Sequence, residues 1–385
     1  MNTVSSPGVR LLLLTNLASP HSIKWVRGLA GRGYQVTVFS LSPYRTEDYA
    51  DLPYFTGYTL GLSDGLVKTK SGRLGKLVYL KAVGQIKDII RRHRPDIVHA
   101  HRATSYGLLG ALTGFHPFVV SVWGDDVYVF PERNAVFRQL VKFVLRRADQ
   151  VLSTSHVMAM QTAKYTDKEI TVTPFGIDMN VFSPAGNKVG EAAGAVVVGT
   201  IKTLEAKYGI DYLLRAFAEV SGRPGRPEVK LLIIGDGSQR TAYQSLAEEL
   251  GITRLVEFTG RVPFDKVPDY HRGIDVFAAL STIDAESFGV AIIEASASGK
   301  PVVVSDAGGP AEVVVNGQTG FIVPKRDASA AATALATLVD DAALRQRMGT
   351  AGRDHAKQHY DWEDNLTLME SVYASITQVT GRNLK

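Results

Sequence analysis

Strand and helix signals alternate along this chain in two series, and this alternation limits the folds that the chain can adopt. In the first series, short apolar strands at residues 9–14 and 35–40 enclose a segment with helical spacing. A segment rich in Gly, Ala and Pro at residues 182–194 interrupts the pattern, and a strand at residues 195–199 starts it again. Alternating strands and helices form parallel sheets that helices cover on both faces. We therefore predict an α/β fold of two doubly wound, Rossmann-like domains with a cleft between them.

The same pattern predicts the extent of each domain. We expect one domain over residues 1–178 and a second over residues 179–364. A last helical segment, residues 365–385, has no strand after it, so we expect it to cross back onto the first domain. The first strand is not followed by G-x-G-x-x-G, which argues against a nicotinamide dinucleotide site there.

Composition excludes several classes of protein. Hydrophobic residues make up 45% of the chain and charged residues 21%, as is usual for globular proteins. We identify neither an apolar run of membrane-spanning length nor a signal peptide, because the apolar run at residues 11–14 is too short. The chain has no cysteine, which excludes disulfides, thiolate nucleophiles and cysteine-ligated metals. These features favour a cytoplasmic protein.

Charge is distributed unevenly along the chain. Residues 1–180 hold 22 Lys and Arg against 13 Asp and Glu, a net charge of +9, whereas the remainder holds 21 against 25, a net charge of −4. A basic half suits an anionic acceptor or an anionic membrane. The segment at residues 71–94 can be a basic amphipathic helix on lipid or the charged outer helix of a sheet layer. Nucleic-acid binding is disfavoured, because the basic residues lack interleaved aromatic residues.

The stretch S-T-I-D-A-E-S-F-G-V-A-I-I-E at residues 281–294 predicts an anion site. Its second half is apolar enough for a helix that begins at Val290. The first N–H groups of a helix lack intrahelical partners, and the helix dipole favours negative charge there. Glu286 lies outside this helix end, and Glu294 lies about one turn inside it. An anion between two carboxylates fits a nucleotide sugar, with its diphosphate at the helix end and its hydroxyls on the acids.

Other residues at predicted strand ends of the second half point to the same ligand. Lys202 and Lys207 follow the first strand of this half and can bind two phosphates as point charges. Arg261 and Val262 follow a later strand and offer backbone groups to a base, and Gly235 ends another strand. Because ligands bind at the carboxyl ends of parallel strands, one site can collect these residues.

The chain resembles the family 4 retaining glycosyltransferases of the GT-B fold over nearly its whole length. The resemblance rests on these segments: D-I-V-H-A-H at 96–101, T-P-F-G-I-D at 173–178, I-I-G-D-G at 233–237, F-T-G-R-V at 258–262, E-S-F-G-V-A-I-I-E at 286–294, G-K-P-V-V-V-S-D-A-G-G at 299–309 and N-G-Q-T-G-F-I-V at 316–323. Each segment is weak evidence by itself, but the ordered set with its E-x7-E spacing is specific. The resemblance implies transfer of a sugar from a nucleoside diphosphate sugar to an acceptor hydroxyl, with the anomeric configuration retained.

The resemblance also implies a role for each donor-site residue. Glu286 would hold hydroxyls of the donor sugar, Glu294 the ribose hydroxyls, and Lys202 and Lys207 the leaving diphosphate. The sugar or diphosphate would also contact Phe288, Gly289 and Val290 at the start of the helix. The lysines and the helix N-terminus can replace the divalent ion of many other transferases, so we expect no metal and no cofactor. The second domain would bind the donor and the first domain the acceptor.

The acceptor side departs from the family pattern. Trp123 stands where many relatives carry a histidine, and a turn ending in His21 replaces their glycine-rich loop. The candidates for acceptor contact are His21, His101, Trp123 and Asp125, although a histidine at a strand end is often structural and adjacent acids often cap a helix. Two other interpretations stay open: an epimerase or phosphorylase-like enzyme on the same fold, and a non-catalytic nucleotide-sugar-binding subunit. Glycolipid, polysaccharide and small-molecule acceptors all fit.

Overall fold

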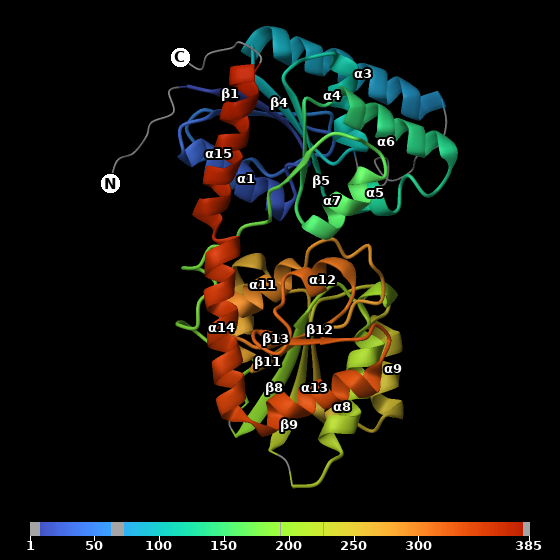
Figure 1. Cartoon of the computed structure of the whole chain (residues 1–385), viewed down its shortest axis with the longest axis vertical. Helices are drawn as coiled ribbons and strands as arrows, with labels where there is room; N and C mark the ends of the chain where they lie inside the picture. Colours follow the sequence, from blue (N-terminus) through green and yellow to red (C-terminus); the bar gives the residue numbers. More distant parts are fainter. Residues whose placement is uncertain (1–7, 63–72, 193, 226, 380–385) are drawn as a thin grey trace. The chain divides into compact units, whose positions relative to one another are not determined.

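The computed structural model describes residues 8–62, 73–192, 194–225 and 227–379, with the backbone alone for residues 73–80 and 379. Predictions on the start of the chain, on residues 71–72 and on residues 380–385 lie outside this part. The chain forms two compact units, of which the first comprises Met1–Thr173 and Leu366–Lys385 and the second Pro174–Asn365. Each unit is an α/β layer structure (Figure 1).

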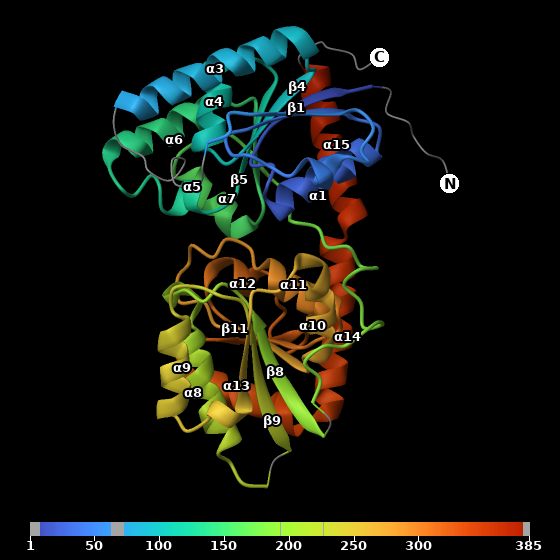
Figure 2. The same cartoon turned by 180° about the vertical axis from the view of Figure 1, so that it is seen from behind.

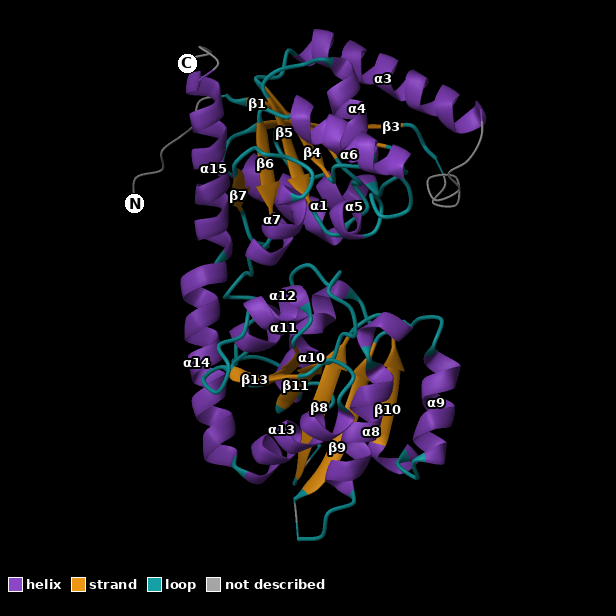
Figure 3. Cartoon of the chain, turned by 45° about the vertical axis from the view of Figure 1, so that its right-hand side comes forward, coloured by secondary structure: helices purple, strands orange, loops and turns teal. Residues whose placement is uncertain are grey.

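The first unit is a parallel sheet with helices on both faces (Figure 3). In the described residues its strand order is β3-β2-β1-β4-β5-β6-β7. The strands are β1 (Arg10–Leu14), β2 (Gln35–Ser40), β3 (Phe55–Thr59), β4 (Ile97–His101), β5 (Phe118–Val122), β6 (Gln150–Ser153) and β7 (Ile170–Val172). The helices are α1 (Pro20–Gly31), α3 (Arg73–His93), α4 (Ser105–Thr113), α5 (Asp125–Tyr128), α6 (Ala135–Arg147) and α7 (His156–Ala163). The strand order reverses between β1 and β4, where such sheets bind ligands.

The second unit repeats this architecture, a sheet with helices on both faces (Figure 2). In its described residues the strand order is β10-β9-β8-β11-β12-β13. Its strands are β8 (Ala195–Ile201), β9 (Glu228–Ile234), β10 (Val256–Gly260), β11 (Val276–Ala279), β12 (Val302–Ser305) and β13 (Gly320–Val323). Its helices are α8 (Ile210–Ser221), α9 (Arg240–Glu249), α10 (Val267–Gly273), α11 (Val290–Ala297), α12 (Gly308–Glu312), α13 (Ala328–Asp340) and α14 (Ala342–Tyr360). Here the order reverses between β8 and β11, which pair in parallel.

The sheets are buried on both faces, which explains the continuous apolar runs of the central strands. Each residue of β1 after Arg10 is buried, as are the five central residues of β8. In the second unit one sheet face packs on α8, α9 and α13, where Phe217 and Leu335 are fully buried. Burial of a side chain of this size stabilises the fold by about 1.5–3 kcal/mol. These packed sheets hold the loops at their strand ends in place.

The last helix, α15 (Trp362–Val379), begins in the second unit and from Leu366 belongs to the first, as the sequence pattern predicts. The hydroxyl of Tyr373 lies 2.7 Å from Nδ1 of His99 on β4, and Glu370 forms an ion pair with Arg32. These contacts fasten α15 to the first sheet and to the end of α1. Among the helices that the structure describes, none is both long and apolar enough to span a membrane.

Candidate active site

The loops after β8 and β11 meet at the point where the strand order of the second sheet reverses. Lys202 directly follows β8, and Glu286 lies in the loop between β11 and α11. Nζ of Lys202 is 2.5 Å from Oε1 of Glu286, and the two side chains are only 24% and 15% exposed. Hydrogen bonds between ionised groups are stronger than neutral ones, and partial burial reduces their screening by water. The structure therefore joins two of the three predicted catalytic residues.

The third predicted catalytic residue, Lys207, lies near Lys202, because both side chains contact the ring of Tyr208. The ring centroid of Tyr208 is 4.4 Å from Nζ of Lys202 and 5.1 Å from Nζ of Lys207. Both ammonium groups are within the distance at which an aromatic ring attracts a cation. The carbonyl of Lys207 accepts a hydrogen bond of 2.9 Å from the backbone N–H of Thr282 in the loop after β11. One ring therefore holds two cations beside the β11 loop.

Glycines allow these loops to approach one another. Gly209 has φ +65°, and a Cβ atom there would overlap the carbonyl oxygen of Leu280. Gly235, one of the predicted donor residues, has φ +138°, and a Cβ atom there would overlap the carbonyl oxygen of Lys202. Glycine adopts positive φ without the steric cost that other residues have. Gly235 therefore supports the loop that carries Lys202.

The start of α11 lies beside Glu286. Gly289 is the N-cap residue with φ +97°, and Val290 is the first residue of the helix. The backbone N–H of Gly309 donates a 2.9 Å hydrogen bond to the carbonyl of Glu286, which fixes the loop on the start of α12. The N–H groups of the first turn of α11 have no intrahelical acceptor, so this end attracts anions.

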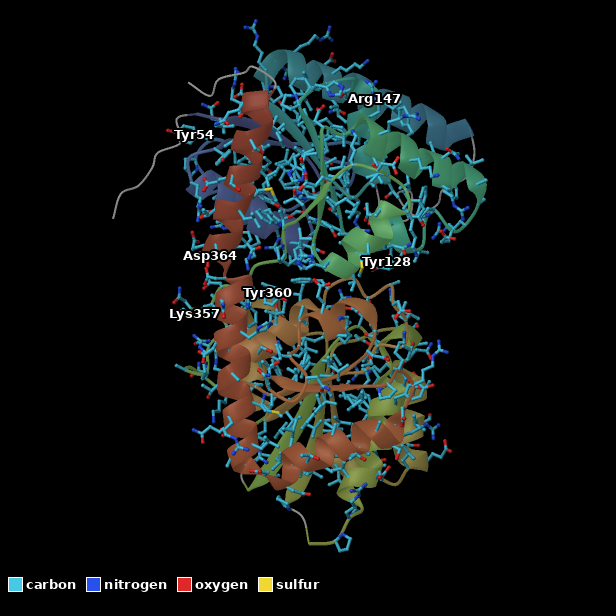
Figure 4. The ribbon with its side chains drawn as sticks, viewed as in Figure 1. Tyr54, Tyr128, Arg147, Lys357, Tyr360 and Asp364 are labelled. Atoms are coloured by element: carbon cyan, nitrogen blue, oxygen red, sulfur yellow. The ribbon has the colours of Figure 1, made fainter. Side chains whose placement is uncertain are left out.

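The side chain of Phe288 is part of the core. Its ring centroid lies 5.6 Å from that of Phe175 and 5.7 Å from that of Tyr360, and the ring is buried. In Figure 4, Tyr360 points inward at the end of α14, whereas Lys357 points away from the unit. Burial raises the pKa of Tyr360 to about 12, with the nearby Glu312 contributing in the same direction. A ligand can therefore use the backbone at Phe288 but not its ring.

Glu294 lies on α11 and is buried. Its Oε2 atom is 3.4 Å from Nε2 of His271 on α10. Arg261 and Val262 follow β10; Arg261 is exposed and Val262 half-buried. No hydrogen bond or ion pair within the described part of the chain joins Arg261 to Lys202, Glu286 or Glu294. The structure thus brings Glu286 and the two lysines together after β8 and β11 and places Glu294 on the helix that follows Glu286.

In the first unit, three of the four predicted acceptor residues form one aromatic cluster. The Trp123 ring lies 4.4 Å from His101 and 6.2 Å from His21, measured between centroids. Nδ1 of His101 is 3.0 Å from the hydroxyl of Thr15, which follows β1. Burial lowers the pKa of His101 well below its usual value, and the nearby His99, Arg102 and His21 add to this. His101 is therefore neutral at neutral pH.

The fourth predicted acceptor residue, Asp125, is exposed at the start of α5, and its neighbour Asp126 is buried. The carboxylate of Asp126 accepts hydrogen bonds from the N–H groups of Ala103, Trp123 and Gly124, at 2.7, 3.1 and 2.8 Å. Burial raises the pKa of Asp126. Asp126 therefore fixes the backbone that follows β4 and β5, and Asp125 is the carboxylate that solvent can reach. Within the described residues, no group of three or more His, Asp or Glu is placed to hold a metal ion.

Two residues near the site were not predicted from the sequence, Tyr208 and His271. Tyr208 follows a predicted lysine, and its ring could have been proposed from that position as a partner for cations. His271 is a lone histidine in a short helix, and nothing in its sequence context links it to Glu294, which lies 23 residues further on.

Comparisons with known proteins agree with this arrangement. The model of the family described as "Glycosyl transferases group 1" matches residues 185–355, and that described as "Glycosyl transferase 4-like" matches residues 10–155. The chain is 31% identical to the GDP-mannose-dependent alpha-(1-6)-phosphatidylinositol monomannoside mannosyltransferase of Mycolicibacterium smegmatis, over 72% of this chain and 76% of that protein. It is also 31% identical to a D-inositol 3-phosphate glycosyltransferase of Corynebacterium aurimucosum, over 60% of this chain and 59% of that protein.

A solved structure has the same fold. HepE of Anabaena, in complex with UDP and glucose, superposes with a TM-score of 0.76 over 95% of this chain and 100% of that chain, at 21% sequence identity. The family models cover most of both units, and the M. smegmatis relative matches across them. The chain is a glycosyltransferase and belongs to the glycosyl transferases group 1 family.

Proposed function

We propose that this protein transfers a sugar from a nucleoside diphosphate sugar to an acceptor hydroxyl and retains the anomeric configuration. The observation that carries this proposal is the contact between Lys202 and Glu286 at the strand-order reversal of the second sheet. In this proposal the ammonium group of Lys202 binds phosphate and the carboxylate of Glu286 binds hydroxyls, and the anion-attracting end of α11 supports both roles. The donor binds to the second unit and the acceptor to the first.

The two lysines act on the leaving group. Negative charge develops on the diphosphate as the bond to the sugar breaks, and cations that are already in place stabilise that state more than the ground state. Lys202 and Lys207 are held near one another by the ring of Tyr208, at 4.4 and 5.1 Å. The first N–H groups of α11 add partial positive charge from the backbone. This arrangement can neutralise a diphosphate without a divalent ion.

The carboxylates select the donor. Glu286 accepts hydrogen bonds from sugar hydroxyls, and the buried Glu294 accepts them from the ribose. The backbone of Phe288, Gly289 and Val290 contacts the sugar or the diphosphate. Arg261, Val262 and Gly235 border the nucleotide from neighbouring strand ends.

The acceptor residues are those of the aromatic cluster in the first unit. Trp123 stacks on the acceptor, while His21, the neutral His101 and the exposed Asp125 supply hydrogen-bond partners. The charge of +9 on residues 1–180 suits an acceptor that carries phosphate or lies in an anionic membrane. The names of two relatives, which act on phosphatidylinositol monomannoside and D-inositol 3-phosphate, support a phosphorylated polyol acceptor.

The test is a panel of nucleoside diphosphate sugars offered with phosphorylated inositol acceptors, with and without EDTA. We expect nucleoside diphosphate release with at least one donor, no loss of rate in EDTA, and an α-linked product from an α-linked donor by NMR. A β-linked product would overturn retention of configuration, and loss of the rate in EDTA would overturn the role of the lysines. An active donor without any phosphorylated acceptor would overturn the acceptor class alone.

A further inference from the structure

His271 is a buried polar residue that none of the proposed catalytic steps uses. Its side chain is fully buried on α10, and its ring lies 5.8 Å from that of Phe182 and 5.4 Å from that of Phe277. Nε2 is 3.4 Å from Oε2 of Glu294, whereas Nδ1 is buried and has no hydrogen-bond partner in the described residues. A buried ring nitrogen without a hydrogen-bond partner destabilises the folded protein, so we expect His271 to have a role that offsets this loss of stability.

The contacts determine which ring nitrogen carries the proton. Glu294 offers a carboxylate oxygen, which accepts, so Nε2 of His271 carries the proton and is the donor. The two aromatic rings around His271 leave it little freedom to turn. The Glu294 side chain keeps 9% of its surface exposed, and a hydroxyl group of a ligand can reach that part. A rigid donor therefore holds one carboxylate oxygen from the buried side.

We propose that His271 is a positioning residue that orients the Glu294 carboxylate toward the two ribose hydroxyls of the donor. This inference rests on the proposed function, in which Glu294 binds the ribose. Without the N–H of His271, the carboxylate can turn within its pocket, and hydrogen bonds to two neighbouring hydroxyls lose their alignment. His271 then affects the binding affinity only of ligands that carry ribose hydroxyls.

Three variants separate this role from packing. His271→Leu removes the donor and keeps an apolar side chain. His271→Gln keeps an N–H donor at a similar distance from the backbone and is expected to restore the wild-type preference. Phe182→Leu changes the packing around the ring but leaves the donor, so it is the matched control.

The experiment is calorimetric titration with UDP and GDP, and with the 2′,3′-dideoxy forms of both, for each variant and for Glu294→Ala. We expect wild type to bind a ribonucleotide at least roughly tenfold more tightly than its dideoxy form, as is typical of hydrogen bonds to a charged group. His271→Leu should bring this ratio close to one with unchanged dideoxy affinity, and His271→Gln and Phe182→Leu should keep it.

Three other results overturn the proposal in different ways. If Glu294→Ala loses the preference for ribose and His271→Leu keeps it, Glu294 binds the ribose and His271 does not position it. If wild type has no preference, or Glu294→Ala keeps it, the assignment of Glu294 is wrong and the role of His271 is overturned with it. Equal weakening of ribose and dideoxy binding in His271→Leu shows a packing role only.

Discussion

At the scale of single residues, the contact between Lys202 and Glu286 is the centre of the proposed chemistry. Without donor, each group satisfies the charge of the other across 2.5 Å. A bound diphosphate would compete for Lys202 and the sugar hydroxyls for Glu286, so the donor meets groups that are already oriented. Removal of one partner leaves a partly buried charge without its counterion, which is costly.

The first prediction concerns the charge on Lys202. We expect Lys202→Ala to lower kcat by about 10²- to 10³-fold, because the variant loses a cation that acts on the leaving diphosphate. Lys202→Arg should retain most of the rate, since it keeps the charge. The matched control is Lys325→Ala, which removes the 2.5 Å ion pair with the exposed Asp284 of the same loop. Steady-state kinetics that show equal losses for the alanine variants at positions 202 and 325 would contradict the assignment.

The second prediction concerns His99, whose ring packs against that of His101 in the aromatic cluster of the first unit. Burial lowers its pKa to about 3. The unfolded chain therefore takes up a proton near pH 6.5 that the folded protein does not, so the free energy of unfolding falls as the pH is lowered from 6.5 toward 3. The slope from this one group is at most about 1.4 kcal/mol per pH unit.

The measurement is urea unfolding of wild type and His99→Gln at several pH values, followed by tryptophan fluorescence. The variant should lose less stability than wild type between pH 6.5 and the acid limit of the assay. Parallel curves for the two proteins would show that His99 does not carry this proton linkage.

At the scale of elements, close approach of loops builds the donor site. The turn at Gly209 packs on the carbonyl of Leu280, which brings Tyr208 and both lysines to the loop after β11. Sheet topology alone brings the strand ends together, and the glycines determine how near the loops come.

The third prediction tests whether the close contact between these loops is needed for donor binding. Gly209→Ala should weaken donor binding and lower the melting temperature, because the methyl group overlaps a backbone oxygen and cannot be accommodated by side-chain movement. Gly251→Ala is the matched control: its φ of +71° resembles the +65° of Gly209, but the space around it is open. It should show only the strain of a left-handed alanine, about 1–2 kcal/mol, with donor affinity unchanged. Equal donor affinity in both variants would contradict the account.

The sequence pattern predicts the central elements more closely than the peripheral ones. β2 has the predicted bounds and α11 begins at the predicted residue, because a buried strand and a helix packed on a sheet are continuously apolar. β3 was not predicted, since it is a half-buried edge strand with a glycine in its centre. α14 was not predicted either, because two of its five buried residues are glycines, Gly349 and Gly352, which weaken the apolar pattern.

For the site, motifs predicted that Lys202, Lys207, Glu286 and Glu294 share one ligand. The structure pairs Lys202 with Glu286 and sets both lysines beside Tyr208, and the shared ligand stays a prediction. The contacts of Tyr208 and His271 could not be predicted, because they depend on how loops and a short helix pack. Likewise, two adjacent acids look alike in the sequence, and only the fold shows that Asp126 is buried and Asp125 exposed.

At the scale of the whole molecule, the two halves of the chain carry opposite net charge, +9 on residues 1–180 and −4 on the remainder. The first unit is basic, and Arg146 and Arg147 are exposed at the end of α6, where Figure 4 labels Arg147. Val136, whose surface is 67% exposed, lies at the start of the same helix. Exposed basic groups favour anionic membrane surfaces. We propose that the first unit makes peripheral contact with such a surface.

The fourth prediction follows from this charge. The protein should co-float with vesicles of phosphatidylcholine and phosphatidylglycerol at low salt and dissociate at about 0.5 M salt, where charges are screened within a few ångström. The double variant Arg146→Glu, Arg147→Glu should bind less. Equal recovery with pure phosphatidylcholine vesicles would contradict an electrostatic contact.

The proposed donor site of the second unit binds a nucleoside diphosphate sugar through Glu294 and the lysine pair. Titration calorimetry with UDP-sugars and GDP-sugars on wild type and Glu294→Ala measures this binding. We expect saturable binding of at least one donor to wild type and at least roughly tenfold weaker binding to the variant, as is typical of lost hydrogen bonds to a charged group. The absence of binding to wild type, or equal affinity in both proteins, would contradict it.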